Sequence, residues 1–182
     1  MCVDEVNADQ ALGSGSRAYR RAQFRAVYNA NYHPVLGFAL RRTASREDAE
    51  DVVAETFLTA WRRLEQVPAG GEARLWLYGV ARRTLANQQR GERRRIRLTG
   101  VLHAESVLHA ARATEAGHEI ARVAAAFARL ANYDREVLTL AAWEGLDAGE
   151  IATVLGCSRN AARIRLHRAR RRVARELDGR HR

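Results

Sequence analysis

Lysine is absent from this chain of 182 residues, which contains only two cysteines, two prolines and one methionine. Neither the two cysteines nor the six histidines have neighbours at ligand spacing, so we expect no metal site and no cofactor. The scarcity of proline and of alternating apolar and polar residues favours an all-α fold. No apolar run approaches the length of a membrane span and the N-terminus lacks a signal-peptide core, so we expect a soluble, cytoplasmic protein without membrane insertion.

Arginine supplies all of the positive charge, and the formal net charge is +10. Residues 147–182 hold ten arginines against four acidic residues, and residues 74–97 hold eight against Glu92 alone. The rest of the chain is therefore slightly acidic. Two separate basic surfaces on such a body predict contacts with the phosphates of one nucleic acid at two places.

Residues 147–173 predict two short helices joined by a tight turn. Asp147 and Glu150 form a capping-box pattern at the start of the first helix. Gly156 permits a left-handed turn, and Ser158 can cap the second helix. A short helix that supports a second, arginine-rich one is the helix-turn-helix arrangement for reading a major groove of DNA.

The second of these helices carries two stripes at helical spacing. The apolar stripe, which we expect to be buried, is Ala162, Leu166, Ala169 and Val173. The polar stripe, which we expect to be exposed, is Asn160, Ile164, His167 and Arg171, with Arg163 and Arg168 alongside. The alternative interpretation is an ordinary helical hairpin whose basic face is only solvated.

The chain before residue 98 predicts further helices. We expect residues 1–16 to be a mobile tail and the helix after it to be kinked or split by Pro34. Ser45 caps the next helix, on which Asp48, Asp51 and Glu55 form an acidic stripe. That stripe is either a solvated face or a docking face for a basic protein partner, and the sequence favours neither.

Residues 65–73 contain a proline and two glycines and predict a loop long enough for a binding role. The helix that follows carries a polar stripe of Arg83, Asn87, Arg90 and Arg94, with Trp76 and Tyr78 near its start. Each ring can stack on an unpaired base, although core packing is favoured for each taken singly. Residues 98–118 predict a flexible linker between two helical domains, 17–97 and 119–178.

The order of these segments resembles that of extracytoplasmic-function sigma factors, the two-domain class of sigma subunits of bacterial RNA polymerase. Three segments carry the resemblance: DAEDVVAETFLTAW at residues 48–61, WLYGVARRTLANQQRGERRR at residues 76–95, and YDREVLTLAAWEGLDAGEIATVLGCSRNAARIRLHRARRRV at residues 133–173. The resemblance implies an all-α fold of two domains, a sigma region 2-like bundle and a sigma region 4-like helix-turn-helix domain. It also accounts for the acidic helix.

The resemblance further implies roles for particular residues. The polymerase-binding residues would be Asp48, Asp51, Glu55 and Phe57, which would meet the clamp helices of the largest subunit. The residues for the minus-ten promoter element would be Arg74, Trp76, Arg82, Arg83, Asn87 and Arg90, together with the loop at residues 65–73. For the minus-thirty-five element, Arg163, Ile164, His167 and Arg168 would face bases, and Arg159, Asn160 and Arg165 would bind phosphates.

The implied partners are core RNA polymerase, including the flap of its second-largest subunit, promoter DNA and an anti-sigma factor. The function would be promoter-specific transcription initiation, a binding function rather than catalysis. A free-standing helix-turn-helix regulator is the competing hypothesis, but the sequence offers no self-pairing helix for a dimer. A nucleic-acid enzyme is disfavoured because the acidic residues cluster on residues 48–55, which we expect to lie away from both arginine runs.

Overall fold

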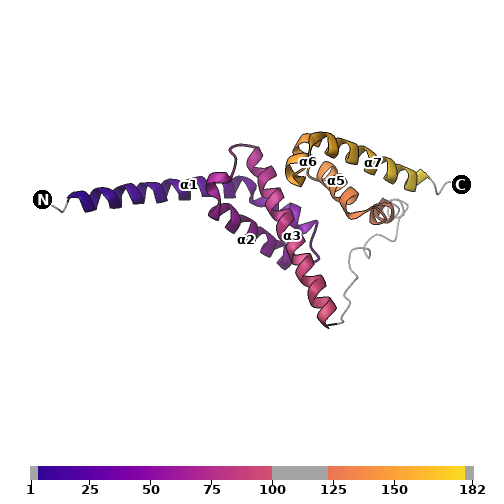
Figure 1. Cartoon of the computed structure of the whole chain (residues 1–182), viewed down its shortest axis with the longest axis horizontal. Helices are drawn as coiled ribbons and strands as arrows, with labels where there is room; N and C mark the ends of the chain where they lie inside the picture. Colours follow the sequence, from indigo (N-terminus) through magenta and orange to yellow (C-terminus); the bar gives the residue numbers. More distant parts are fainter. Residues whose placement is uncertain (1–3, 100–122, 179–182) are drawn as a thin grey trace. The chain divides into compact units, whose positions relative to one another are not determined.

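The computed structural model describes residues 4–99 and 123–178, and every regular element in these ranges is a helix (Figure 1). The chain divides into two compact units, residues 1–92 and 93–182. The predicted all-α architecture of two helical domains is therefore confirmed. The part of the linker beyond Thr99 lies outside the described residues, and the domain bounds 17–97 and 119–178 stay predictions.

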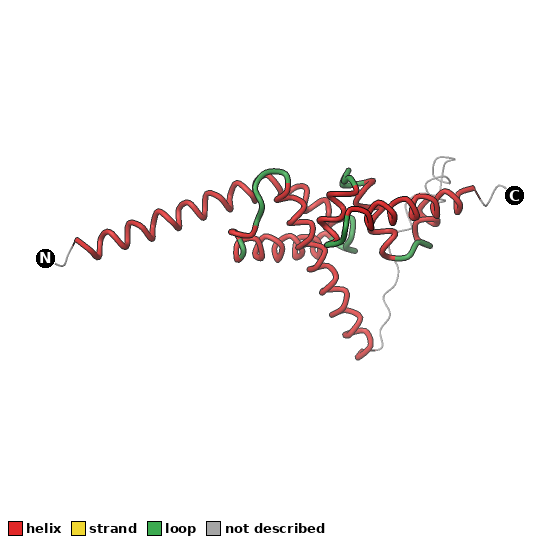
Figure 2. The backbone as a smooth tube through the Cα atoms, turned by 45° about the horizontal axis from the view of Figure 1, so that its top comes forward, coloured by secondary structure: helices red, strands yellow, loops and turns green. Residues whose placement is uncertain are grey.

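The first unit contains α1 (Asp4–Leu40), α2 (Arg46–Arg62) and most of α3 (Glu72–Thr99), with a short 3₁₀ helix, η1 (Leu64–Gln66), after α2. Helix α1 passes through Pro34 without a break, so the predicted split is wrong. Residues 4–16 form the first turns of α1 where the sequence suggested a tail, and the mobility of that segment stays a prediction. The N-terminal half of α1 extends beyond α2 and α3 (Figure 2).

Helix α2 begins where the sequence predicts. The Ser45 hydroxyl accepts a hydrogen bond from the Asp48 amide at 3.0 Å, which satisfies one of the free N–H groups of the first turn. The core of this unit contains Val35 and Phe38 of α1, Val52 of α2 and Leu77 of α3, all at most 1% exposed. The Phe38 ring stacks on Tyr78, with centroids 4.7 Å apart, so the core-packing interpretation of Tyr78 is confirmed.

The second unit contains helical residues 123–128 followed by α5 (Asn132–Ala142), α6 (Ala148–Leu155) and α7 (Arg159–Asp178). Ala131 is the N-cap of α5 and makes no side-chain hydrogen bond there. Asp134 lies in the first turn and its carboxylate pairs with Arg172 of α7. The core is formed by Val137, Leu140 and Ile151, each at most 1% exposed, and by the small side chains of α7.

Candidate nucleic-acid and protein interfaces

The turn between α6 and α7 is fixed by local hydrogen bonds. The Asp147 carboxylate accepts from the amides of Gly149 at 2.6 Å and Glu150 at 2.9 Å, and the Glu150 carboxylate accepts from the Asp147 amide at 2.8 Å. The amide of Glu150, followed by that of Gly149, holds the pKa of the Asp147 carboxyl below its ordinary value. Gly156 ends α6 at a φ of 64°, and Ser158 accepts from the Ala161 amide at 3.2 Å. All three predicted caps are confirmed.

Helix α7 rests on its small residues. Ala162 and Ala169 are 0% exposed and Leu166 is 8% exposed. Side chains this short let α7 lie close to α5 and α6, so the rotation of α7 about its own axis is fixed by packing. Three members of the predicted buried stripe are therefore buried, whereas the fourth, Val173, is only part-buried because it lies near the end of α7. The three buried residues determine which side of α7 faces solvent.

The polar stripe of α7 faces solvent as predicted. Its exposed members are Arg159, Asn160, Arg163, Ile164, His167, Arg168 and Arg171. Arg163 donates to the side-chain Oδ1 of Asn160 at 3.0 Å, which links two of the candidate contact residues. Ile164, at 40% exposure, adds an apolar group of the kind that contacts a thymine methyl.

Arg165 differs from the rest of the predicted DNA-binding set. Its guanidinium lies 4.3 Å from the centre of the Tyr133 ring and donates to the Tyr133 hydroxyl at 2.5 Å, and this contact is part-buried. Tyr133 belongs to α5, so Arg165 ties α7 to its supporting helix. The sequence missed this role because no local pattern pairs residues 32 positions apart. A phosphate contact by Arg165 stays a prediction.

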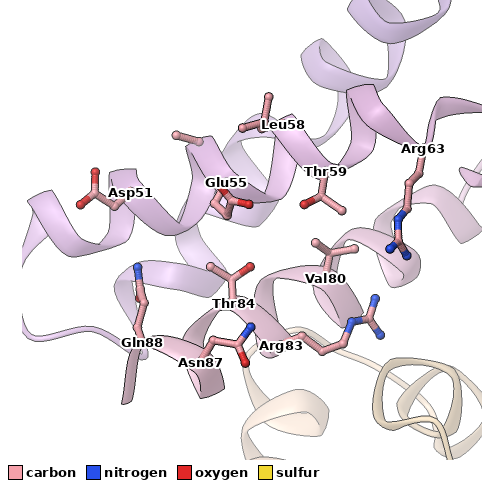
Figure 3. Close-up of a pocket in the computed structure, with 11 residues that line it drawn as sticks. Asp51, Glu55, Leu58, Thr59, Arg63, Val80, Arg83, Thr84, Asn87 and Gln88 are labelled. Atoms are coloured by element: carbon pink, nitrogen blue, oxygen red, sulfur yellow. The ribbon is translucent and has the colours of Figure 1, made fainter. Parts of the chain in front are cut away.

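A groove of about 670 Å³ lies between α2 and α3 (Figure 3). Asp51 and Glu55 line it from α2, and Arg83 and Asn87 line it from α3. Arg63 and Arg83 lie at one end and Asp51 at the other, so the groove is acidic at one end and basic at the other. The expectation that the acidic helix lies away from the arginine run at residues 74–97 is therefore wrong, because α2 and α3 line one groove in which Asp51, Glu55 and Arg83 all lie.

Two predicted polymerase contacts lie elsewhere. Asp48 does not line the groove, and its carboxylate accepts from the Ser45 hydroxyl at 2.7 Å in the first turn of α2. Phe57 is only 4% exposed, with its ring 4.7 Å from that of Tyr28 and edge-on to Phe24. A buried ring cannot meet a partner without unfolding its surroundings, so we correct the assignment of Phe57 from docking to core packing.

The candidate loop before α3 is shorter than predicted. Helix η1 includes Glu65 and α3 begins at Glu72, so only residues 67–71 lie between them. Gly70 has a φ of 64°, and its carbonyl accepts from the Ala73 amide at 3.3 Å. The physical reason is that Ala73, at 4% exposure, and Leu75, at 7%, gain by packing in the core as parts of a helix.

The remaining minus-ten candidates are spread over α3. Arg74 and Trp76 are part-buried in its first turns, and the buried Nε of Arg74 has no hydrogen-bond partner. Arg82 is part-buried on the helix, whereas Arg90 is exposed and donates to Asn87 at 2.5 Å. The structure thus joins Arg83, Asn87 and Arg90 into one exposed cluster and leaves Arg74 and Trp76 at the loop.

Neither a metal centre nor a membrane span is found in the part of the chain that the structure describes. In those residues no group of three His, Cys, Asp or Glu side chains is arranged to hold a metal ion. None of the described helices is long and apolar enough to cross a bilayer. Cys157 is a free, part-buried thiol in the turn between α6 and α7.

Known proteins match both units of the chain. The family model of Sigma-70 region 2 matches residues 27–95, and that of Sigma-70, region 4 matches residues 120–173. ECF RNA polymerase sigma factor SigL of Mycobacterium tuberculosis is 32% identical over 159 residues, which cover 86% of this chain and 89% of the relative. RNA polymerase sigma factor CnrH of Cupriavidus metallidurans is 30% identical over 187 residues, 97% of this chain and 95% of the relative.

Two solved structures are similar in fold. The sigma factor RpoE, in complex with the anti-sigma factor NepR from Bartonella quintana, has a TM-score of 0.63 at 23% identity over 87% of this chain and 96% of that one. CnrH in complex with the cytosolic domain of CnrY has a TM-score of 0.58 at 26% identity over 97% of this chain and 98% of that one. With both family models matched in order, and with relatives of this identity and coverage, the chain belongs to the ECF family of RNA polymerase sigma factors.

Proposed function

We propose that this ECF sigma factor binds core RNA polymerase and directs initiation by placing its two units on two elements of one promoter. Promoter-specific initiation with RNA polymerase follows from the family. The proposal concerns which residues bind polymerase and which bind each promoter element. The observation that carries it is the exposed stripe of α7, which caps and packing hold in one orientation. The protein acts by binding and carries out no reaction of its own.

Helix α7 would enter the major groove of the minus-thirty-five element. Base edges would be contacted by Arg163, Ile164, His167 and Arg168, and phosphates by Arg159 and Asn160, with Arg165 as a further phosphate candidate. Each good bidentate contact between an arginine and a guanine gives about 1–3 kcal/mol of discrimination. Rigid support by α5 and α6 favours this role, because a recognition helix that rotates freely loses that discrimination.

The minus-ten element would be opened along α3. Arg83, Asn87 and Arg90 form a cluster suited to the backbone of a separated strand, and Arg74, Trp76 and Arg82 would act beside the loop at residues 67–71. Taking a base out of the stack costs a few kcal/mol. One small unit cannot offset that cost for several bases, so opening would require polymerase to be bound at the same time.

The acidic end of the groove would dock on polymerase. Asp51 and Glu55, with Asp48 at the start of the same helix, would meet basic residues of the clamp helices in the largest subunit, and the second unit would meet the flap of the second-largest subunit. The structure of CnrH with the cytosolic domain of CnrY supports a protein partner for this chain too, which we propose to be an anti-sigma factor. A cytoplasmic location follows from such partners.

Run-off transcription tests the proposal directly. Core polymerase should yield discrete transcripts from genomic fragments only when the chain is added. The double variant Asp51→Arg and Glu55→Arg should abolish co-purification with core polymerase and leave the helical circular dichroism unchanged. Glu65→Arg, an exposed reversal on η1 outside the groove, is the matched control and should bind normally. Normal co-purification of the double variant would refute the docking assignment.

Promoter reading has its own test. Arg168→Ala should lower promoter-specific transcription by at least tenfold and non-specific DNA binding by much less. Arg175→Ala, an exposed arginine in the last turn of α7, is the control for loss of one positive charge. Substitution of Gly70 and Gly71 should impair opening on duplex promoters more than on pre-melted ones. Equal losses on both kinds of DNA would contradict the assignment of the loop.

A further inference from the structure

A third basic segment runs along most of α1 to the first residue of α2, apart from the two arginine-rich segments described above. Residues 10–46 contain seven arginines and no aspartate or glutamate. This local excess is hidden when the charge is summed over everything outside residues 74–97 and 147–182, because acidic residues elsewhere cancel it. Four of the seven arginines, Arg17, Arg20, Arg21 and Arg25, lie within nine residues of α1.

Four of these seven arginines make contacts within the protein. Arg20 lies over the Trp61 ring at 5.2 Å and donates to the Trp61 carbonyl at 3.1 Å, so it joins α1 to the end of α2. Arg42 lies over the Phe38 ring at 3.6 Å, Arg46 pairs with Glu50 at 2.8 Å, and Arg41 also has a contact within the fold. These four arginines are therefore occupied by the protein itself.

Arg17, Arg21 and Arg25 are different. All three are exposed, and no ion pair to them is found among the residues whose side chains the structure describes. Their spacing of four residues places them in one row on α1, about 6 Å apart along the helix axis and about 12 Å from first to last. We call this set the α1 arginine row. The contact of Arg20 with Trp61 and the edge-on packing of Phe24 on Trp61, at 5.2 Å, fix how the row is turned relative to α2.

The row lies before the residues that the family model of Sigma-70 region 2 matches. The Sigma-70 region 2 match begins at residue 27, two residues after Arg25. The N-terminal half of α1, which bears the row, extends beyond α2 and α3 (Figures 1 and 2). An exposed cationic row on a helix that extends beyond its neighbours is accessible to a long polyanion in a way that a charge beside the core is not.

We propose that the α1 arginine row is a third DNA-binding surface, which contacts the phosphates of duplex DNA in the promoter complex. The proposal rests on the proposed function for the presence of DNA. Arginine binds phosphate through paired N–H groups, and a row about 12 Å long spans about three to four phosphates of one strand at about 3.4 Å each along the duplex axis. A protein partner is disfavoured because the neighbours of the row include the small or polar Ala18, Ala22 and Gln23. The aromatic side chain between the arginines, Tyr19 at 73% exposure, is two positions from both Arg17 and Arg21 and so lies on the other side of the helix, where it gives this row no apolar anchor.

The test uses the full chain with core polymerase and promoter DNA. Arg17, Arg21 and Arg25 are changed together to glutamine, which keeps helix propensity and length, or together to lysine, which keeps the charge. Affinity for the promoter is measured from 50 to 200 mM salt. Three lost phosphate contacts lower the slope of log affinity against log salt by about 2.7. When the salt is raised from 50 to 200 mM, the wild type should therefore lose about 40-fold more affinity than the glutamine variant, because a slope difference of about 2.7 over a fourfold change in salt corresponds to that factor.

Two controls separate the row from general charge effects. The lysine variant should keep the wild-type slope within about 0.5, because phosphate contacts depend mainly on charge. Arg21→Gln should lower the slope by about 0.9, and Arg62→Gln, which removes one exposed arginine from the end of α2, by much less. Equal slopes for the wild type and the glutamine triple variant would overturn the proposal.

Binding to core polymerase without DNA is measured on the same proteins. The glutamine variant should bind core as the wild type does, and a loss there would overturn the proposal in favour of an acidic protein surface as partner. If the wild type itself bound no core and gave no transcript, the proposed function would fail. A wild type that initiates normally with an unchanged slope in the variant would refute the α1 arginine row alone.

Discussion

The contact between Arg165 and Tyr133 allows a quantitative test of what holds the recognition helix in place. Tyr133→Phe removes the hydroxyl that accepts from Arg165 at 2.5 Å and keeps the ring under the guanidinium. A hydrogen bond to a charged group contributes about 1.5–3 kcal/mol, and partial exposure of this one reduces the figure. We expect Tyr133→Phe to lower the free energy of unfolding of the second unit by about 0.5–1.5 kcal/mol.

Arg165→Met removes the charge and keeps much of the apolar stem. It loses both the hydrogen bond and the cation–π contact, which adds about 0.5–2 kcal/mol depending on exposure. If Arg165 and Tyr133 interact, the double variant should lower the free energy of unfolding by less than the sum of the two single variants, and the coupling energy should be about 1 kcal/mol. A change of that size shifts the melting temperature of a unit this small by about 4–8 °C.

Trp143 provides the signal for this measurement. The chain has three tryptophans, and Trp143 lies in the second unit, 57% exposed and edge-on to Phe127 at 5.7 Å. In a background with Trp61→Phe and Trp76→Phe, fluorescence therefore follows unfolding of the second unit alone. Tyr19→Phe, at a side chain that is 73% exposed in the first unit, should have no effect.

The same variants distinguish positioning of α7 from phosphate binding by Arg165. Tyr133→Phe leaves the charge of Arg165 in place, so a residue that only binds phosphate should still do so. A residue that positions α7 should instead lose promoter discrimination more than non-specific affinity when Tyr133 loses its hydroxyl. A coupling energy below about 0.3 kcal/mol, which is within the error of additivity, would refute the positioning role.

Three further predictions concern single residues. Phe57→Ala should lower the free energy of unfolding of the first unit by about 3–5 kcal/mol and lower its urea midpoint. Leu58→Ala, at a groove residue that is 41% exposed, should leave that midpoint nearly unchanged and weaken polymerase binding. Equal midpoints for the two variants would contradict the assignment of Phe57 to the core. Gly156→Ala should lower the free energy of unfolding, measured by thermal melts, by about 1–2 kcal/mol. The positive φ is the whole cause, because no atom lies within 4 Å of the added Cβ. Folding lowers the pKa of the Asp147 carboxyl. Its contribution to the free energy of unfolding is therefore present above the unfolded-state pKa of about 3.9 and is lost as the pH falls through the folded-state pKa. The difference in stability between the wild type and Asp147→Asn should shrink below about pH 4, and a difference that stays constant would refute the role of the charged cap.

The parts of the fold that the sequence predicted are those set by neighbouring residues. The caps at Ser45, Asp147 and Ser158 depend on side chains and amides two or three positions apart, so the sequence contains all of their partners. The buried stripe of α7 follows from helical spacing in the same way. Pro34 does not split α1, because tertiary packing on both sides of it, at Asn31 and Val35, offsets one missing backbone hydrogen bond. Whether it kinks the helix stays a prediction.

Contacts between distant elements could not be predicted. The pairing of Arg165 with Tyr133 and of Arg172 with Asp134 depends on how α7 lies on α5, and no periodicity contains that information. Phe57 is instructive for a different reason. Phe57 lies at four-residue spacing from Ala49 and Val53, which is the spacing of one apolar helix face. The family resemblance alone assigned it to docking. Its burial at 4% exposure shows that the periodicity was the better guide.

The shared groove between α2 and α3 bears on how polymerase binding and promoter opening are linked. Asp51 and Glu55 attract a cationic partner, and that partner would neutralise the carboxylates that lie in the same groove as Arg83. Loss of nearby negative charge raises the potential around Arg83 and Asn87, and so strengthens their attraction to a phosphate backbone. Docking would then favour strand capture through charge alone, with no change of shape. This coupling predicts that Glu55→Gln, which removes one charge at the groove, strengthens single-stranded DNA binding by the chain in the absence of polymerase, and an unchanged affinity at low salt would refute it.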